Sequence, residues 1–188
     1  RAQSLEFRLQ NESLLVQKAL ERPLVGWGGW GRSRVYDDTG QPITIADGLS
    51  EDFITALSEV DGNIWIGTVR SGICIFESAT GRLRKIEGPN FLLTHIRAFA
   101  QDSKGNLWIG TQNGLVRYAT GEFHLVPVQQ LPELSVRALL WEADNTLWVG
   151  TRDDGLLRIR GDQVFHFHAR NGLIHNRIYH LLATADDL

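Results

Sequence analysis

Several features that would assign this chain to a familiar functional class are scarce or missing. Cys74 is the only cysteine among 188 residues, so an intrachain disulfide is impossible. Cys74 stands in an apolar run, residues 73–76, where a thiol is usually a small buried hydrophobe rather than a reactive group. No window approaches 18 consecutive apolar residues, so we expect no membrane-spanning helix within this chain.

An excess of basic residues is also missing. The chain has 19 Lys and Arg against 22 Asp and Glu, a formal net charge of −3, and no basic run. Because a nucleic-acid-binding surface needs clustered positive charge, we exclude nucleic acid as a partner. The apolar content of 43% is sufficient for a packed core. The sequence begins at Arg1 without a Met, which we interpret as a processed or trimmed end.

Motifs for catalysis, cofactors and metals are not recognisable. We find no Gly-rich phosphate loop and no Ser, His and Asp constellation, and therefore predict a chain that is not an enzyme and binds no cofactor. His166 and His168 lie on one side of a predicted strand, a spacing that could bind a metal. No further ligand stands nearby at a suitable spacing, so we predict no metal site.

The sequence does contain a phrase that occurs three times. Residues 62–68 read Gly-Asn-Ile-Trp-Ile-Gly-Thr, residues 105–111 read Gly-Asn-Leu-Trp-Ile-Gly-Thr, and residues 145–151 read Asn-Thr-Leu-Trp-Val-Gly-Thr. The tryptophans are 43 and 40 residues apart, and a second apolar phrase that starts with glycine follows each one, at residues 72–76, 114–118 and 155–159. A period of about 40 residues is typical of a four-stranded propeller blade.

Each repeat divides into four short apolar segments separated by turn residues, which predicts an antiparallel meander. The segments are apolar in both alternation phases, so each sheet should be covered on both faces by neighbouring sheets. We therefore predict an all-β fold of β-propeller blades with about four copies and a partial one. The predicted parts are an outer strand at 4–10, a degenerate blade at 11–46, blades at 53–87, 96–128 and 136–168, and a partial blade at 176–188. The predicted innermost strands are 53–59, 96–101, 136–142 and 177–184.

The two repeated phrases resemble the two-component regulator propeller family, over about residues 25–188. The resemblance implies a bacterial sensor whose propeller lies outside the cytoplasmic membrane, in the periplasm, and whose output is a histidine kinase, a diguanylate cyclase or a related domain. It also implies a ligand-sensing role that is not itself catalytic. Members of the family usually close a ring of more blades than this chain holds, so we expect a part of a larger propeller.

Two sets of repeated residues are predicted to be structural. A tryptophan on the second strand of every blade should fill the wedge between neighbouring blades. The glycine two residues later should allow close packing. These residues are Trp65, Trp108, Trp148, Gly67, Gly110 and Gly150.

The second residue of each innermost strand is the first candidate for ligand binding. Innermost strands line the central channel of a propeller, so two arginines at equivalent places would form a positive mouth for an anionic ligand, a small molecule or an oligosaccharide. The alternative is that each arginine pairs with a carboxylate of a neighbouring blade. The four candidates are Thr55, Arg97, Arg137 and Tyr179.

The turn that follows each tryptophan phrase is the second candidate, because it is polar and differs between otherwise similar copies. Such turns are either part of a binding surface or simply solvated. We expect them to open on the same face as the long links between repeats. The candidates here are Arg70, Gln112, Asn113, Arg152 and Asp153.

Other functions and assemblies remain open at the level of sequence. A propeller enzyme, such as a lyase acting at the channel mouth, and a pure protein-interaction scaffold are alternatives to a sensor. The blade count allows an excised part of a longer propeller, two chains that complete one ring, or closure through a strand at residues 5–9 paired with residues 178–182. Further blades or a second chain are thus expected partners.

Overall fold

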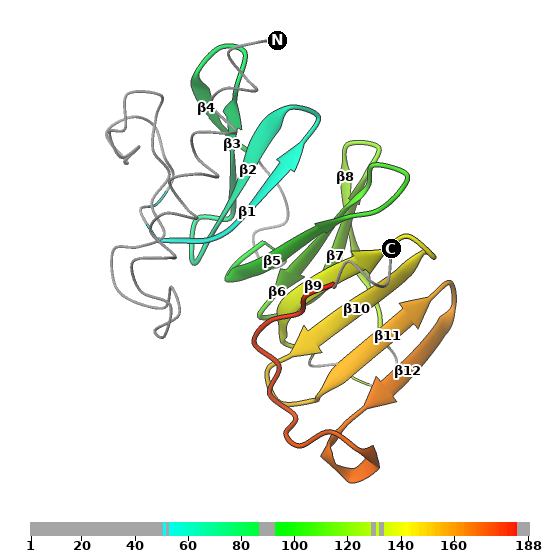
Figure 1. Ribbon diagram of the computed structural model, residues 1–188. Coiled ribbons are helices and arrows are strands. Elements are labelled where there is room, and N and C mark those ends of the chain that lie inside the picture. The colour runs from blue at the N-terminus through cyan, green and yellow to red at the C-terminus, as the bar shows by residue number, and fades with distance from the viewer. Residues whose placement is uncertain (1–50, 52, 87–92, 129–130, 132–133, 184–188) are drawn as a thin grey trace, which may run out of the picture.

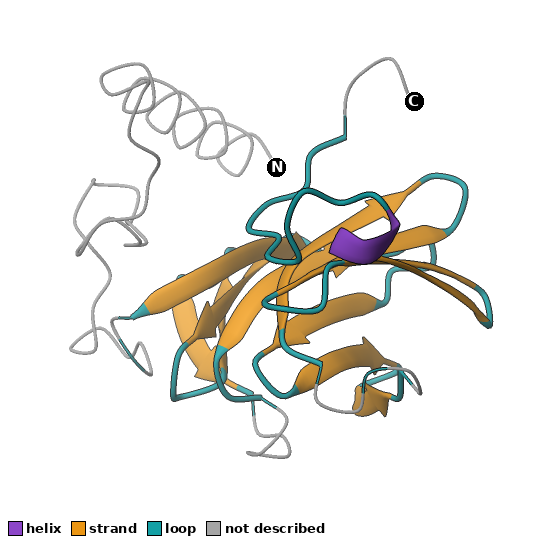
Figure 2. Cartoon of the chain, turned by 90° about the horizontal axis from the view of Figure 1, so that it is seen from below, coloured by secondary structure: helices purple, strands orange, loops and turns teal. Residues whose placement is uncertain are grey.

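The computed structural model describes residues 51, 53–86, 93–128, 131 and 134–183. The described residues form three four-stranded antiparallel sheets in which the strands follow one another in sequence order (Figure 1). Apart from one turn of 3-10 helix, η2 (Ala169–Asn171), the described part of the chain contains no helix (Figure 2). The predicted all-β fold of propeller blades is therefore confirmed.

The first blade consists of β1 (Ile54–Val60), β2 (Asn63–Thr68), β3 (Ile73–Glu77) and β4 (Arg82–Lys85). The second consists of β5 (Ile96–Gln101), β6 (Leu107–Thr111), β7 (Gly114–Ala119) and β8 (Glu122–Val126). The third consists of β9 (Val136–Glu142), β10 (Thr146–Thr151), β11 (Leu156–Arg160) and β12 (Gln163–Phe167).

Short turns join neighbouring strands. Asp61 and Gly62 connect β1 to β2 with φ angles of 51° and 76°, and Thr120 and Gly121 connect β7 to β8 with 52° and 87°. Two successive positive φ angles characterise the hairpin turn whose twist matches that of the flanking strands. Local sequence is therefore sufficient to close these hairpins.

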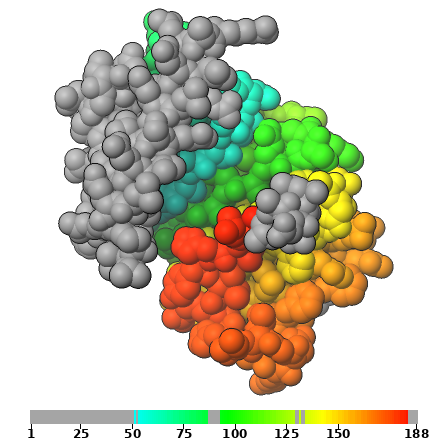
Figure 3. All heavy atoms as spheres, viewed as in Figure 1, coloured from blue at the N-terminus to red at the C-terminus, as the bar shows by residue number. Residues whose placement is uncertain are grey.

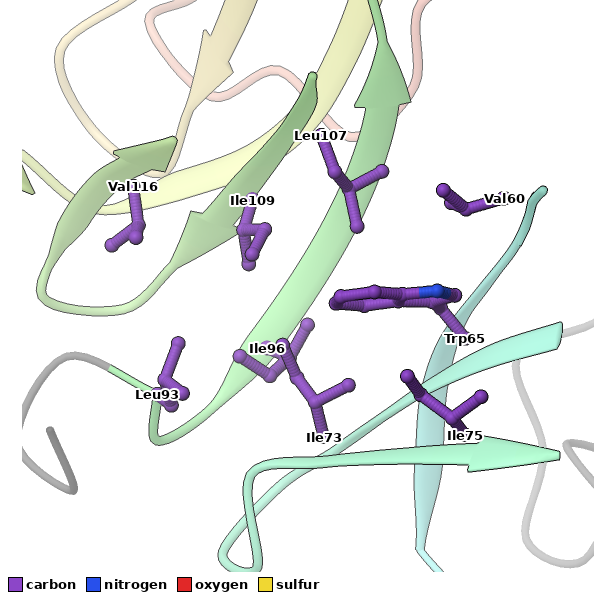
Figure 4. Packing of buried hydrophobic residues seen from close by; sticks show 9 residues of the cluster. All are labelled: Val60, Trp65, Ile73, Ile75, Leu93, Ile96, Leu107, Ile109 and Val116. Atoms are coloured by element: carbon purple, nitrogen blue, oxygen red, sulfur yellow. The ribbon is translucent and has the colours of Figure 1, made fainter. Parts of the chain in front are cut away.

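The blades pack side by side, with β1, β5 and β9 adjacent at the centre and β4, β8 and β12 at the outer edge (Figure 1). A buried apolar cluster joins the first two blades, and in Figure 4 the ring of Trp65 lies among side chains from both of them, including Leu107 and Ile75. A second cluster, which includes Leu115, Val136 and Leu147, joins the second blade to the third. Burial of both sheet faces is what the apolar strands predicted.

The strand predicted for residues 177–184 is wrong where the structure describes it. Residues 177–183 form no strand, because no described segment pairs with them. An apolar segment becomes a strand only when a neighbouring strand satisfies its backbone N–H and C=O groups. The degenerate blade at 11–46, the outer strand at 4–10 and the end of the partial blade lie outside the described residues, and the division into blades stays a prediction.

Candidate functional site

An irregularity of pairing recurs at the start of all three central strands. The pairing with the neighbouring strand skips the residue between Ile54 and Ala56 in the first blade. It likewise skips the residue between Ile96 and Ala98 in the second blade and between Val136 and Ala138 in the third. Each skipped residue therefore forms a β-bulge, a feature that redirects a side chain away from the regular alternation. The skipped residues are Thr55, Arg97 and Arg137.

Thr55 uses its side chain to connect two blades. Its Oγ1 atom lies 3.1 Å from the carbonyl oxygen of Gly67 and 2.5 Å from the carbonyl oxygen of Ile96. Since a hydroxyl has one proton, it donates to one of these acceptors at a time. The contact joins the first blade to β5.

Arg97 and Arg137 stand at the same place in neighbouring blades. Partial burial, followed by the positive charges of Arg137 and Arg152, lowers the pKa of Arg97. Among the described residues, no carboxylate lies within ion-pair distance of Arg97 or Arg137. The described part of the chain thus offers no carboxylate partner of the kind that the alternative interpretation requires.

Tyr179 and Arg177 reach the same region from the segment that follows η2. The guanidinium of Arg137 lies 4.9 Å from the centroid of the Tyr179 ring, a cation–π contact. Arg177 donates from Nη2 to Oδ1 of Asp153 at 2.7 Å and from Nε to the carbonyl oxygen of Arg152 at 3.2 Å. In Figure 3 the segment of residues 172–183, coloured red, lies against the third blade and the start of β5.

Asp153 holds two arginines. Besides the bond to Arg177, its Oδ2 atom lies 3.4 Å from Nε of Arg152. The hydrogen bond from Arg177 is the main cause that lowers the pKa of Asp153, with contributions from Arg152 and Arg137. Asp153, followed by Tyr179, raises the pKa of Arg177 in turn. We call this group the arginine cluster; it contains Arg97, Arg137, Arg152, Asp153, Arg177 and Tyr179.

Arg177 is the member that repeat comparison misses. It occupies the link position that is His95 in the second blade and Ser135 in the third, so the repeat offers no pattern there. Its side chain enters the arginine cluster only because the link crosses the turn between β10 and β11.

The remaining turn candidates bind residues of their own links. The backbone N–H groups of Arg70 and Ser71 donate to Oε2 of Glu51 at 2.7 and 3.1 Å. The N–H of Gln112 donates to the carbonyl oxygen of His95, and Nδ2 of Asn113 donates to Oγ1 of Thr94 at 3.1 Å. The turns and links therefore share one face, but these contacts do not connect Arg70, Gln112 or Asn113 to the arginine cluster.

The two strand histidines are engaged with nearby backbone. Nε2 of His166 contacts the carbonyl oxygen of Asp154, and Nδ1 of His168 accepts from the N–H of Arg170. Within the described ranges, no group of three or more His, Cys, Asp and Glu is arranged to hold a metal.

The repeated tryptophans lie on the blade flanks. Trp65 is buried between the first two blades, and Trp108 stacks on Trp141 of the third blade with centroids 6.1 Å apart. Trp148 is half-buried, with its ring centroid 6.0 Å from that of Phe167 in its own blade.

Comparison with known proteins agrees with this architecture. The sequence model described as "Two component regulator propeller" matches residues 48–70 and 90–113. These two segments, which include the first two strands of the first and second blades, thus match the two-component regulator propeller repeat. No match was found among curated proteins.

Solved structures with similar folds include two extracellular domains from B. thetaiotaomicron. The domain of the one-component system BT4673 has 21% identity and a TM-score of 0.67, over 80% of this chain and 22% of that chain. The domain of the hybrid two-component system BT3049 has 28% identity and a TM-score of 0.59, over 68% of this chain and 18% of that chain. The chain thus spans about a fifth of the length of either domain.

The fold is also similar to that of virginiamycin B lyase from Staphylococcus aureus, with 19% identity and a TM-score of 0.53, over 70% of this chain and 46% of that chain. At this identity the likeness concerns the fold alone. In the described part of the chain, no helix has the length and apolar character needed to cross a membrane.

Proposed function

We propose that this chain is a ligand-sensing part of a bacterial signalling protein, located in the periplasm and not catalytic itself. The proposal is supported by the two-component regulator propeller repeats and by the likeness to extracellular domains of one-component and hybrid two-component systems. The ligand is anionic, either a small molecule or an oligosaccharide that carries negative groups.

One observation carries the proposal. Arg97 and Arg137 stand on equivalent β-bulges of adjacent central strands, and no described carboxylate pairs with either. Arg152 and Arg177 add two positive charges, against which Asp153 supplies one negative charge. A convergence of guanidinium groups on one face attracts and orients oxyanions.

The proposal is tested by replacing Arg97 and Arg137 together by alanine and titrating pyrophosphate into the purified chain by calorimetry. We expect the affinity to fall at least about tenfold, and its dependence on salt to weaken, because two charge-assisted contacts are lost. Arg82→Ala with Arg84→Ala is the matched control, since it removes two exposed charges from the outermost strand β4. Equal affinities for both double variants would refute the proposed site.

The lyase-like alternative has less support. The one carboxylate of the arginine cluster, Asp153, is bound to Arg152 and Arg177, and its pKa is lowered. A general base works best when its pKa is near the operating pH, and a carboxylate stabilised in its charged form is a weak base. A scaffold without a ligand would not need two arginines at equivalent bulges that have no carboxylate partner among the described residues.

We propose further blades, or a second chain, as structural partners. Trp148 and Phe165, which is 43% exposed, lie on one flank of the third blade. The corresponding flank of the second blade carries Trp108 and is covered by the third blade. The proposed organisation is one propeller segment over residues 1–188 with blades at about 53–87, 96–128 and 136–168. It includes a degenerate blade at 11–46, an outer strand at 4–10 and a partial blade at 176–188.

A further inference from the structure

We propose that Asp153 is a built-in competitor of the anionic ligand: its carboxylate occupies an oxyanion position between Arg152 and Arg177, and the ligand binds by displacing it. This inference rests on the proposed function of the arginine cluster. It goes beyond that function by assigning Asp153 as the residue that sets the affinity and by giving the chemical class of ligand that can displace it.

The first step is the geometry of the carboxylate. Oδ1 of Asp153 accepts from Nη2 of Arg177 at 2.7 Å, and Oδ2 lies 3.4 Å from Nε of Arg152. Each oxygen thus faces a different guanidinium, as the oxygens of a bound carboxylate or phosphate would. Guanidinium groups recognise such planar or tetrahedral oxyanions through charge-assisted hydrogen bonds.

The second step is that the backbone beside the arginines is anchored. The N–H of Gly155 donates to the carbonyl oxygen of Asn176 at 2.8 Å, and the N–H of Ile178 donates to that of Thr151 at 3.0 Å. These bonds fasten the Arg152 turn to the Arg177 segment. Nε of Arg177 also donates to the carbonyl oxygen of Arg152, which fixes its side chain. The guanidinium of Arg177 and the backbone of Arg152 therefore stay in place when the carboxylate leaves.

The third step is that Asp153 can leave easily. It stands at the exposed tip of the turn, and its side chain is 58% exposed. Asp154, the next residue, is held by a hydrogen bond from its N–H to Oγ1 of Thr151 at 2.9 Å. Among the described residues the Asp153 carboxylate contacts Arg152 and Arg177 alone, so its rotation into water breaks these two ion pairs and leaves an open oxyanion position beside Arg177.

The fourth step is the ligand class. An attached carboxylate has a high effective concentration, on the millimolar scale or above, so a ligand with a single oxyanion gains little by replacing it. A second negative group on the ligand makes displacement of Asp153 favourable, because Arg97 and Arg137 act electrostatically on the same region. The ligand is therefore a small molecule with at least two oxyanion groups, either carboxylates or phosphates.

The experiment compares Asp153→Asn with the matched control Asp154→Asn, which removes the same charge from the neighbouring position. Pyrophosphate and citrate are the two probes, and acetate is the single-group reference. If the closed turn is favoured about twofold to fivefold, as for an exposed ion pair, removing the competitor raises the apparent affinity roughly threefold to sixfold. We expect this gain for Asp153→Asn and not for Asp154→Asn, with acetate weak in every case.

The outcomes separate the two proposals. A gain for both probes supports a shared oxyanion site, whereas a gain for one identifies carboxylate or phosphate as its chemistry. Unchanged or weaker binding by Asp153→Asn, together with loss of binding by the Arg97 and Arg137 double variant, would overturn the competitor and leave the proposed function standing. Unchanged binding by that double variant would refute the proposed function itself. Asp153→Ser is a second variant that removes the carboxylate. A denaturant midpoint measured for each variant shows that it is folded.

Discussion

Ile96 lies directly on Gly67 of the preceding blade, so close that a Cβ atom added to Gly67 would be 2.4 Å from Cγ2 of Ile96. Val136 covers Gly110 with the same distance to Cγ1, and Ile178 covers Gly150 with 2.7 Å to Cγ2. A β-branched residue at the start of one central segment thus packs against the glycine of the blade before it. Any larger residue in place of the glycine would push the blades apart.

The first prediction is that Gly110→Ala destabilises the chain by about 3 kcal/mol, at the upper end of the range for overpacking, because the new methyl group collides with Val136. Chemical denaturation of the purified variant measures the change. Combining it with Val136→Ala removes the colliding group and should restore part of the stability, so that the double variant loses less than the sum of the two single ones. Strict additivity would contradict the contact.

The second prediction concerns Trp108, which stacks on Trp141 of the next blade and donates from Nε1 to Oδ2 of Asp102 at 3.3 Å. Trp108→Ala should cost about 3 kcal/mol in the free energy of unfolding, as expected for truncation of a large packed aromatic. Trp148→Ala is the matched control, because its ring contacts Phe167 within its own blade, and we expect a smaller loss. A Trp108→Ala loss below about 1 kcal/mol, from the denaturant midpoint, would place the ring outside the blade interface.

The third prediction is a pH dependence that arises from Asp102. Burial would raise the pKa of Asp102, but hydrogen bonds from Asn106, from the Lys104 N–H and from Trp108 outweigh it and lower the pKa. The folded pKa is therefore below the unfolded one. The stabilisation is fully present above the unfolded pKa, near pH 4, and is lost as the pH falls through the folded value.

Asp102→Asn should consequently cost about 2 kcal/mol at neutral pH, the order expected for hydrogen bonds to a charged group, and should flatten the fall in stability below pH 4. Denaturant unfolding at several pH values measures both effects. Asp144→Asn is the control: Asp144 is exposed, accepts a hydrogen bond from the N–H of Thr146 at 3.1 Å and lies 3.8 Å from Nη2 of Arg160, and an exposed ion pair contributes little, so the effect should be small. An Asp102→Asn curve parallel to the wild type would contradict the assignment.

The sequence by itself determined the blades. The tryptophan phrase and its period predicted four-stranded blades, about four copies and a partial one, and three four-stranded sheets lie within the described residues. The predicted central strands 96–101 and 136–142 coincide with β5 and β9, while 53–59 differs from β1 by one residue. Apolar patterning and turn residues are local properties, so they specify strands and hairpins without reference to the rest of the chain. The sequence also singled out Thr55, Arg97 and Arg137 as equivalent positions, although it did not predict that each forms a bulge.

The tertiary structure decided how the candidate residues meet. Arg177 and Asp153 are 24 residues apart and lie in a link and a turn that vary between repeats, so no period brings them together in the sequence. Their contact depends on the path of the link across the third blade. The same path leaves residues 177–183 without a pairing strand among the described residues. Ile178 nevertheless covers Gly150, as the first residues of β5 and β9 cover the glycines of the blades before them. Strand formation requires a partner for the backbone, and only the packed structure shows whether one is present.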